Sequence, residues 1–277
     1  MRARRCCGTS TAWGVGGQGQ RVAGDGMVAA AGMAAGAPLA LPGASLTALQ
    51  LALLHVAAYT VLFTAADAFL EWRRSQGQAT LSPKPPSRAA VGRERLRTLC
   101  SALVDAAYYW LILRHGSFHR VPDTAAGLGQ LTLFGAGLFL FADAHFYVTH
   151  RLLHWGPLYR HVHYVHHQSV NPGAWSSLSF HPIEAAIFFS VHLPMLLLPT
   201  PRDLFLIYKV GLVVGPLHAH CGVDLGPMLH SSVDHYLHHR YKRGNFGGYL
   251  PLDRLCGTGL RRDGTLCCEA PAAEGHR

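Results

Sequence analysis

Residues 125–167 read AAGLGQLTLFGAGLFLFADAHFYVTHRLLHWGPLYRHVHYVHH, and this stretch decides the expected fold. Its first part, Ala125 to Ala142, is an uncharged apolar run that predicts a membrane-spanning helix. Two histidine clusters follow directly, His150-Arg-Leu-Leu-His154 and His163-Tyr-Val-His166-His167. An apolar helix that leads into closely spaced imidazoles predicts a metal centre at the edge of a membrane domain.

The composition of the 277 residues agrees with a membrane protein. Hydrophobic residues make up 49% and charged residues 14%, against about 25% charged in an ordinary soluble domain. The formal charge of +9 does not indicate nucleic-acid binding, because the cations are not interleaved with aromatics and no recognition motif is present. Seven cysteines without C-x-x-C pairs argue against a disulfide framework or a zinc ribbon.

Four further apolar segments are candidate membrane spans. They are Leu46–Leu70, Thr98–Leu113, Ile183–Leu198 and Leu204–Leu217. Thr98–Leu113 is short and contains Asp105, which weakens it as a span. The last two are joined by only five residues, 199–203, and therefore form an antiparallel hairpin. The pattern predicts an all-α integral membrane protein with about four to five transmembrane helices and a helical cap that carries a histidine-rich di-metal site.

Cations between Arg73 and Arg97 predict the orientation of the chain. This segment carries seven arginines and lysines and is broken by prolines, so the positive-inside rule places it in the cytoplasm. The order of the spans then brings residues 143–182 and 218–262, the two histidine-dense stretches, to the same cytoplasmic face. Residues 1–42 are expected to be a disordered or targeting tail, 43–262 the membrane domain and 263–277 a C-terminal tail.

The histidines themselves carry the chemistry. Fifteen of nineteen lie between His145 and His239, and a third cluster reads His235-Tyr-Leu-His238-His239. Residues three or four apart share one face of a helix, so we expect each cluster to point two or three imidazoles in one direction. Eight imidazoles exceed what one first-row metal accepts, which implies two ions. The absence of thiolates argues against a structural zinc site, and redox chemistry favours iron.

Other histidines belong to no cluster and are expected to be structural. These are His55, His115, His119, His145, His192 and His276, while His161 is expected near the site or on the surface. Asp143 lies one heptad before His150, and we expect its carboxylate to orient a ligand imidazole. Two other classes of function stay open. A metal transporter or sensor needs a series of polar residues in the spans, which Asp67, Asp105, His192 and Lys209 do not form; an inactive scaffold would bind no metal.

At these residues the chain resembles the fatty acid hydroxylase and sterol desaturase superfamily. Residues 143–154 resemble the acidic and aromatic lead into its H-R-x-x-H box, and 161–167 resemble its second box. Residues 181–184, His-Pro-Ile-Glu, and 220–222, His-Cys-Gly, are similar to the family's H-P-x-E and H-x-G motifs. Residues 235–258 are similar to the third box with its N-Y-G and W-D-R/K-x-x-G-T endings.

The resemblance implies about four membrane helices, a cytoplasmic di-iron centre, O2 as oxidant and, in a eukaryote, the endoplasmic reticulum. It also implies electrons from NAD(P)H through a separate cytochrome b5-type carrier, since no H-P-G-G haem motif is present. It adds His220 to the ligands and makes His218 and Asp224 possible neighbours. The expected metal ligands are then His150, His154, His163, His166, His167, His220, His235, His238 and His239.

Two features narrow the resemblance. Only eight residues separate His154 from His163, which excludes the acyl-CoA desaturase layout with its long membrane stretch between the first two boxes. Leu252 and Phe246 stand where the family often has Trp and Tyr. Residues 175–182 and 251–253 are most similar to the sterol C-5 desaturase-like branch. Fatty acid hydroxylases and sterol methyl oxidases share every box, so a lipid C–H bond is the expected point of attack.

Overall fold

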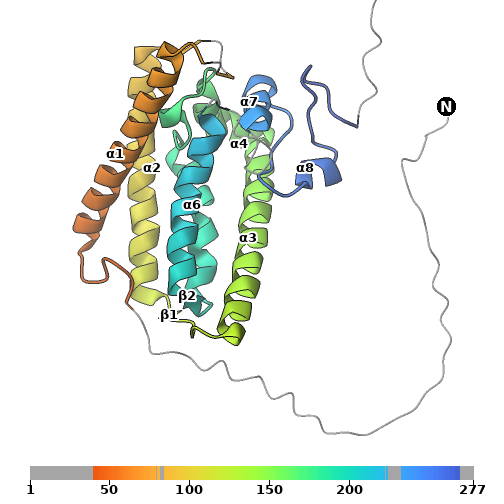
Figure 1. Cartoon of the computed structure of the whole chain (residues 1–277). Coiled ribbons are helices and arrows are strands. Elements are labelled where there is room, and N and C mark those ends of the chain that lie inside the picture. Colours follow the sequence, from red (N-terminus) through yellow and green to blue (C-terminus); the bar gives the residue numbers. More distant parts are fainter. Residues whose placement is uncertain (1–39, 79, 82–83, 222, 224–231, 269–277) are drawn as a thin grey trace, which may run out of the picture. The chain divides into compact units, whose positions relative to one another are not determined.

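The computed structural model of the chain describes residues 40–78, 80–81, 84–221, 223 and 232–268. The predicted N-terminal tail, apart from residues 40–42, lies outside them, as do Asp224, His276 and most of the C-terminal tail. Within this part the fold is almost entirely helical (Figure 1). The exception is a pair of two-residue parallel strands, β1 (Phe118–His119) and β2 (Thr200–Pro201).

Three helices are long and apolar enough to cross a membrane: α1 (Ala48–Ser75), α2 (Arg88–His115) and α3 (Ala125–Leu153). Each begins at a hydroxyl residue whose side chain accepts a hydrogen bond from a backbone N–H of the first turn: Thr47, Ser87 and Thr124. The prediction of an all-α membrane protein is confirmed. The segment Thr98–Leu113, which seemed too short to span, is part of the continuous α2.

The predicted hairpin is present in a broken form. Its first arm divides into α5 (Pro182–Phe189) and the 3-10 helix η3 (Ser190–Leu196), and its second arm is α6 (Arg202–His220). Pro194 lies inside η3, where it removes a backbone donor. Among the described residues only α1, α2 and α3 meet the length and hydropathy of a full span. The number of four to five spans therefore stays a prediction.

Three of the four polar residues in the apolar segments converge on one point inside the bundle. Lys209 pairs with Asp105, and His192 Nε2 lies 3.4 Å from the same carboxylate. Tyr59 donates a hydrogen bond of 2.8 Å to Asp105, whose exposed fraction is 0%. These four residues, from four different elements, form what we call the Asp105 hub. Asp67 is not part of the hub and pairs with Arg95 instead, at 3.6 Å.

The other short elements gather at one end of the bundle. They are α4 (Gly156–His161), the 3-10 helices η1 (His163–Gln168) and η2 (Ala174–Ser176), α7 (Ser232–Tyr241) and α8 (Leu252–Leu255). In Figure 1, α4 and α7 lie at the opposite end from β1 and β2. As expected, Gly156 and Pro157 open a new helix after α3. Both histidine-dense stretches therefore reach the same end.

Helix α2 fixes the loops that carry the second cluster. Arg97 donates hydrogen bonds to the carbonyl of Val165 and to the side chain of Gln168, at 3.1 and 2.9 Å. Further along, Thr98 and Ser101 donate to backbone carbonyls of residues 175 and 178, at 2.7 and 2.8 Å. These bonds tie η1 and η2 to a rigid helix and so position the imidazoles of η1.

Candidate metal centre

Nine histidines meet at this end of the bundle in two groups. Within each group every residue offers a possible ligand atom, and these atoms all lie within 4.8 Å of one another. The first group is His150, His154, His163, His167 and His238; the second is His166, His220, His235 and His239. All nine are the histidines that the sequence singles out. The structure brings them together, and metal binding by them stays a prediction.

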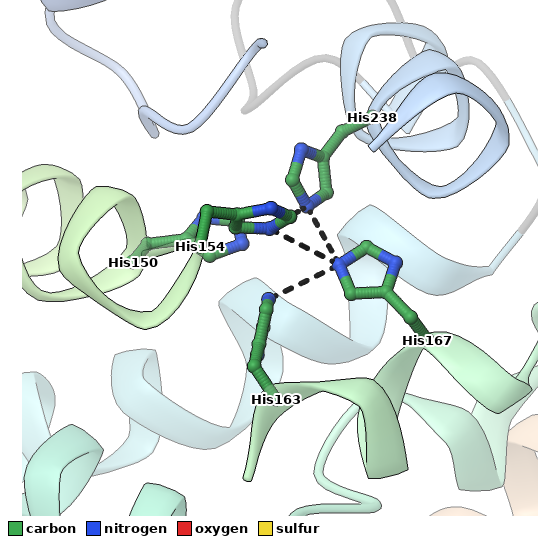
Figure 2. A group of neighbouring side chains, drawn as sticks. All are labelled: His150, His154, His163, His167 and His238. Atoms are coloured by element: carbon green, nitrogen blue, oxygen red, sulfur yellow. Dashed lines mark hydrogen bonds between the residues drawn. The ribbon is translucent and has the colours of Figure 1, made fainter. Parts of the chain in front are cut away.

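The first group is drawn from three elements. His150 and His154 come from the end of α3, His163 and His167 from η1, and His238 from α7 (Figure 2). The Nε2 atom of His167 lies 3.1 Å from Nε2 of both His163 and His238, and 3.2 Å from Nε2 of His154. Four ring nitrogens therefore point at one small volume.

The second group has the same character. His220 Nε2, at the end of α6, lies 2.7 Å from His235 Nε2 and 3.1 Å from His239 Nε2. His235 and His239 are 3.2 Å apart through their Nε2 atoms. His166 completes the group, with its ring centroid 4.7 Å from that of His239. His220, which entered only through the family resemblance, is thus an integral member.

Each cluster points two of its imidazoles at one group, as expected, but the second and third clusters send their remaining histidine to the other group. The second cluster sends His163 and His167 to the first group but His166 to the second, and the third sends His238 and His239 to different groups. The reason is angular. Adjacent side chains diverge by about 100° on an α-helix and about 120° on a 3-10 helix, so adjacent histidines cannot reach one ion together.

Hydrogen bonds to the far side of two rings show why a cation fits the first group. Nδ1 of His150 donates to the carbonyl of Phe246 at 2.9 Å, and Nδ1 of His238 donates to the carbonyl of Gly244 at 2.7 Å. These oxygens only accept, so each ring carries its proton on Nδ1 and its lone pair on Nε2. Lone pairs that converge without a donor repel one another. A metal ion between them relieves that repulsion.

Burial keeps the imidazoles in the form that binds metal. It lowers the pKa of His163, His166, His167, His238 and His239 well below the usual value for histidine, and the charges of neighbouring imidazoles lower these pKa values further. The rings are therefore neutral at physiological pH. Neutral imidazole is the state that ligates a metal.

Glu184 supports an imidazole of the first group, a role that its place in the H-P-x-E motif does not by itself indicate. Its Oε1 accepts a hydrogen bond of 2.7 Å from Nδ1 of His163, and both side chains are almost fully buried. A carboxylate behind a histidine raises the basicity of the ligating nitrogen and fixes its ring. The signal available in the sequence was a lone acid at the start of an apolar helix.

Asp143 binds the backbone of the segment that returns after α7. Its two carboxylate oxygens accept hydrogen bonds from the backbone N–H groups of Tyr249 and Leu250, at 2.7 and 2.9 Å. This contact follows from its position on α3, which faces the returning segment after α7. It therefore holds the chain that follows Phe246, and its expected effect on a ligand imidazole stays a prediction.

The remaining histidines lie outside both groups. His161 is exposed, in agreement with the expectation that it lies either near the site or on the surface. His145 Nε2 contacts the hydroxyl of Ser190 at 3.0 Å, and His192 belongs to the Asp105 hub. His181 accepts a hydrogen bond at the start of α5, from the backbone of Ile183. His218, expected as a possible neighbour, joins neither group.

A cavity of about 400 Å³ ends at the histidines. Its walls come mainly from α3, α5 and α6, and they are almost entirely apolar, with Leu138, Phe146, Phe188, Leu204 and Leu212 among them. Five of the nine histidines line its other end: His150, His163, His166, His220 and His235. Exposed residues such as Phe139 and Ile207 also border it. The cavity therefore opens towards the outside of the bundle, between apolar helices.

The family model described as fatty acid hydroxylase matches residues 135–258, which contain both histidine groups and most of the cavity wall. This part of the chain is therefore similar to that family. The matched segment begins within α3 and ends at Thr258, six residues after the start of α8. No solved structure matches the chain significantly.

Curated fungal proteins with three different names are similar to this chain. The Delta(7)-sterol 5(6)-desaturase of Saccharomyces cerevisiae is 33% identical over 130 residues, which cover 46% of this chain and 36% of that protein. The methylsterol monooxygenase erg25B of Aspergillus fumigatus is 33% identical over 138 residues, 45% of each chain. The fatty acid hydroxylase ahd1 of Mycosarcoma maydis is 33% identical over 120 residues, covering 42% of this chain and 30% of the relative. The matched part of the chain thus spans less than half the length of these relatives.

Proposed function

We propose that this protein is a membrane-bound di-iron oxidoreductase that uses O2 to desaturate or hydroxylate a C–H bond of a lipid, with a sterol as the favoured substrate. The single observation that carries the proposal is the apolar cavity that ends at two groups of converging imidazoles. The sterol desaturases among its relatives support the choice of sterol. Iron bound in the two groups supplies the activation of O2 that no amino-acid side chain provides.

The residues of the domain divide the remaining work. The apolar walls of the cavity hold the lipid and exclude water around the carbon that reacts. Glu184 and the carbonyls of Gly244 and Phe246 keep three imidazoles aimed at the first group. The lateral opening beside Phe139 and Ile207 admits the substrate directly from the bilayer.

The reaction requires an external source of electrons. Desaturation removes two hydrogens from the lipid and reduces O2 to two waters with two added electrons and two protons; hydroxylation uses the same electrons and yields one water. Exposed Arg151 lies on α3 beside His150, exposed Arg160 lies on α4 between the first two histidine clusters, and His154 of the first group is only half-buried. This basic surface suits an acidic electron carrier of the cytochrome b5 type, which receives its electrons from NAD(P)H.

The expected location follows from charge. The cationic segment between Arg73 and Arg97 joins the ends of α1 and α2, and the side chain of Arg97 reaches the η1 segment that carries His163 and His167. The positive-inside rule then places the histidines in the cytoplasm. In a eukaryotic cell the endoplasmic reticulum is the proposed membrane.

The test is a substitution combined with metal and product analysis. We expect His166→Ala to abolish product formation from sterol and acyl substrates while the protein still inserts into membranes. His161→Ala is the matched control, because this neighbour is exposed and belongs to neither group. About two irons per wild-type chain are expected. Zinc alone would support a transporter or sensor, no metal would support an inactive scaffold, and turnover retained by His166→Ala would contradict the ligand assignment.

A further inference from the structure

The segment that follows α7 carries the two carbonyls that orient His238 and His150, and a run of hydrogen bonds fixes this segment to the rest of the domain. We call residues 244–250 the strap. It supplies the carbonyls of Gly244 and Phe246, which accept the Nδ1 protons of His238 and His150. Both histidines belong to the first group. The backbone position of the strap therefore sets where two of the five rings in that group point.

Asp253 holds the strap from one side. Its Oδ1 accepts hydrogen bonds from the N–H of Phe246 at 2.9 Å and from the hydroxyl of Thr258 at 2.7 Å. Its Oδ2 accepts a hydrogen bond of 2.6 Å from the N–H of Gly247. A Cβ on Gly247 would lie only 2.8 Å from this oxygen, so the residue must be glycine for the carboxylate to approach.

The same carboxylate is tied to helix α3. Thr258, which donates to Asp253, accepts a hydrogen bond of 3.1 Å from the hydroxyl of Tyr147. That hydroxyl in turn accepts from Arg151 at 3.0 Å. Tyr147 and Arg151 flank His150 on α3, so one connected network joins the helix that carries His150 to the carbonyl that orients it.

Asn245 lies between the two carbonyls and fixes the turn of the strap there. Its φ of +54° is in the left-handed region, which asparagine adopts more readily than most residues other than glycine. Its side chain accepts a hydrogen bond from the N–H of Leu260 at 2.7 Å and donates to the carbonyl of Asp234 at 3.1 Å. These two bonds connect the strap to Leu260 and to α7.

We propose that Asp253 is a positioning residue for the first histidine group, acting on His150 and His238 through the strap. The inference rests on the proposed function, because it assumes that this group binds a metal ion. Among the described contacts, both imidazoles on the strap belong to the first group. Asp253 therefore controls one metal site and leaves the other unchanged.

The experiment measures the two sites separately. Full-length protein in detergent is stripped of metal, titrated with Co²⁺ under anaerobic conditions and followed by visible absorption, which reports the ligand geometry at each ion. In Asp253→Asn an amide NH2 group replaces one carboxylate oxygen and cannot accept a hydrogen bond. We therefore expect the affinity for Co²⁺ at one of the two sites to fall by about 10–100-fold. The second site should keep its wild-type affinity and spectrum. Asp263→Asn is the matched control, since that carboxylate is exposed and bonds only within its own turn.

A milder variant protects the test against misfolding. Thr258→Val removes one hydrogen bond to Asp253 and leaves the carboxylate in place. We expect a smaller loss at the same site with the same spectral change. Equal affinity at both sites in Asp253→Asn and Thr258→Val, or equal loss at both, would overturn the positioning role. Wild-type protein that binds two ions but converts no lipid contradicts only the proposed function; wild-type protein that binds no ion overturns both.

Discussion

The domain contains two buried polar clusters that differ in how their polar groups are compensated for the loss of water. In the Asp105 hub, a carboxylate is surrounded by Lys209, His192 and Tyr59, so opposite charges and donors meet one another. In the histidine groups, nine rings of the same kind face each other without any opposite charge at their centre. The hub contains both signs of charge, whereas the histidine groups require a cation from outside. Chemistry is therefore expected at the second cluster and cohesion of the bundle at the first.

The largest expected effect is the loss of stability when the hub is disrupted. Asp105→Ala leaves Lys209 buried and unpaired, and removing one partner of a buried ion pair costs about 3–5 kcal/mol. We expect the free energy of unfolding, measured by denaturant titration in micelles, to fall by about this amount. Asp105→Leu combined with Lys209→Met should recover most of it, because no charge is then left alone.

Asp67→Ala is the control for this prediction. Its pair with Arg95 is largely at the surface, since Arg95 is about half exposed, and such a pair contributes about 0–1 kcal/mol. A loss of stability for Asp105→Ala as small as that for Asp67→Ala would show that the hub is hydrated and does not hold the bundle together.

A smaller effect is expected behind the histidine groups. Glu184→Gln keeps the shape of the side chain but replaces the carboxyl group that faces Nδ1 of His163 by an amide. Affinity for Fe²⁺ at the first group should fall by about 10–100-fold, measured by anaerobic titration. Asp203→Asn is a control outside both clusters, because Asp203 is exposed and pairs only with Arg202. An unchanged affinity in Glu184→Gln would mean that metal binding by the first group does not depend on the carboxyl group behind His163.

The smallest expected effect separates the cavity from both clusters. Gly211 lines the cavity, and a Cβ there would meet nothing within 4 Å, so Gly211→Leu fills space without disturbing the helix packing. We expect kcat/KM for the lipid to fall by about tenfold with metal content unchanged. Gly137→Leu is the matched control, because this glycine also has free space but does not line the cavity. Equal activity in both variants would place the substrate elsewhere.

Sequence reasoning reached much of the fold because its signals are local. Long apolar runs identified α1 and α3, and Gly156-Pro157 marked the break before α4. The spacing of the histidines selected eight of the nine members of the two groups, and the family resemblance added His220. The two strands β1 and β2 were missed, since two residues carry no periodicity.

The amino-acid sequence by itself determined that this chain is a helical membrane protein whose histidines gather at one end, because hydropathy and helical spacing are properties of neighbouring residues. Only the tertiary structure decided how the nine rings divide into five and four, that Glu184 supports His163, and that Asp143 and Asp253 hold the strap. It also decided that Asp105, His192 and Lys209 meet. These contacts join residues from different helices, and their distances depend on how those helices pack.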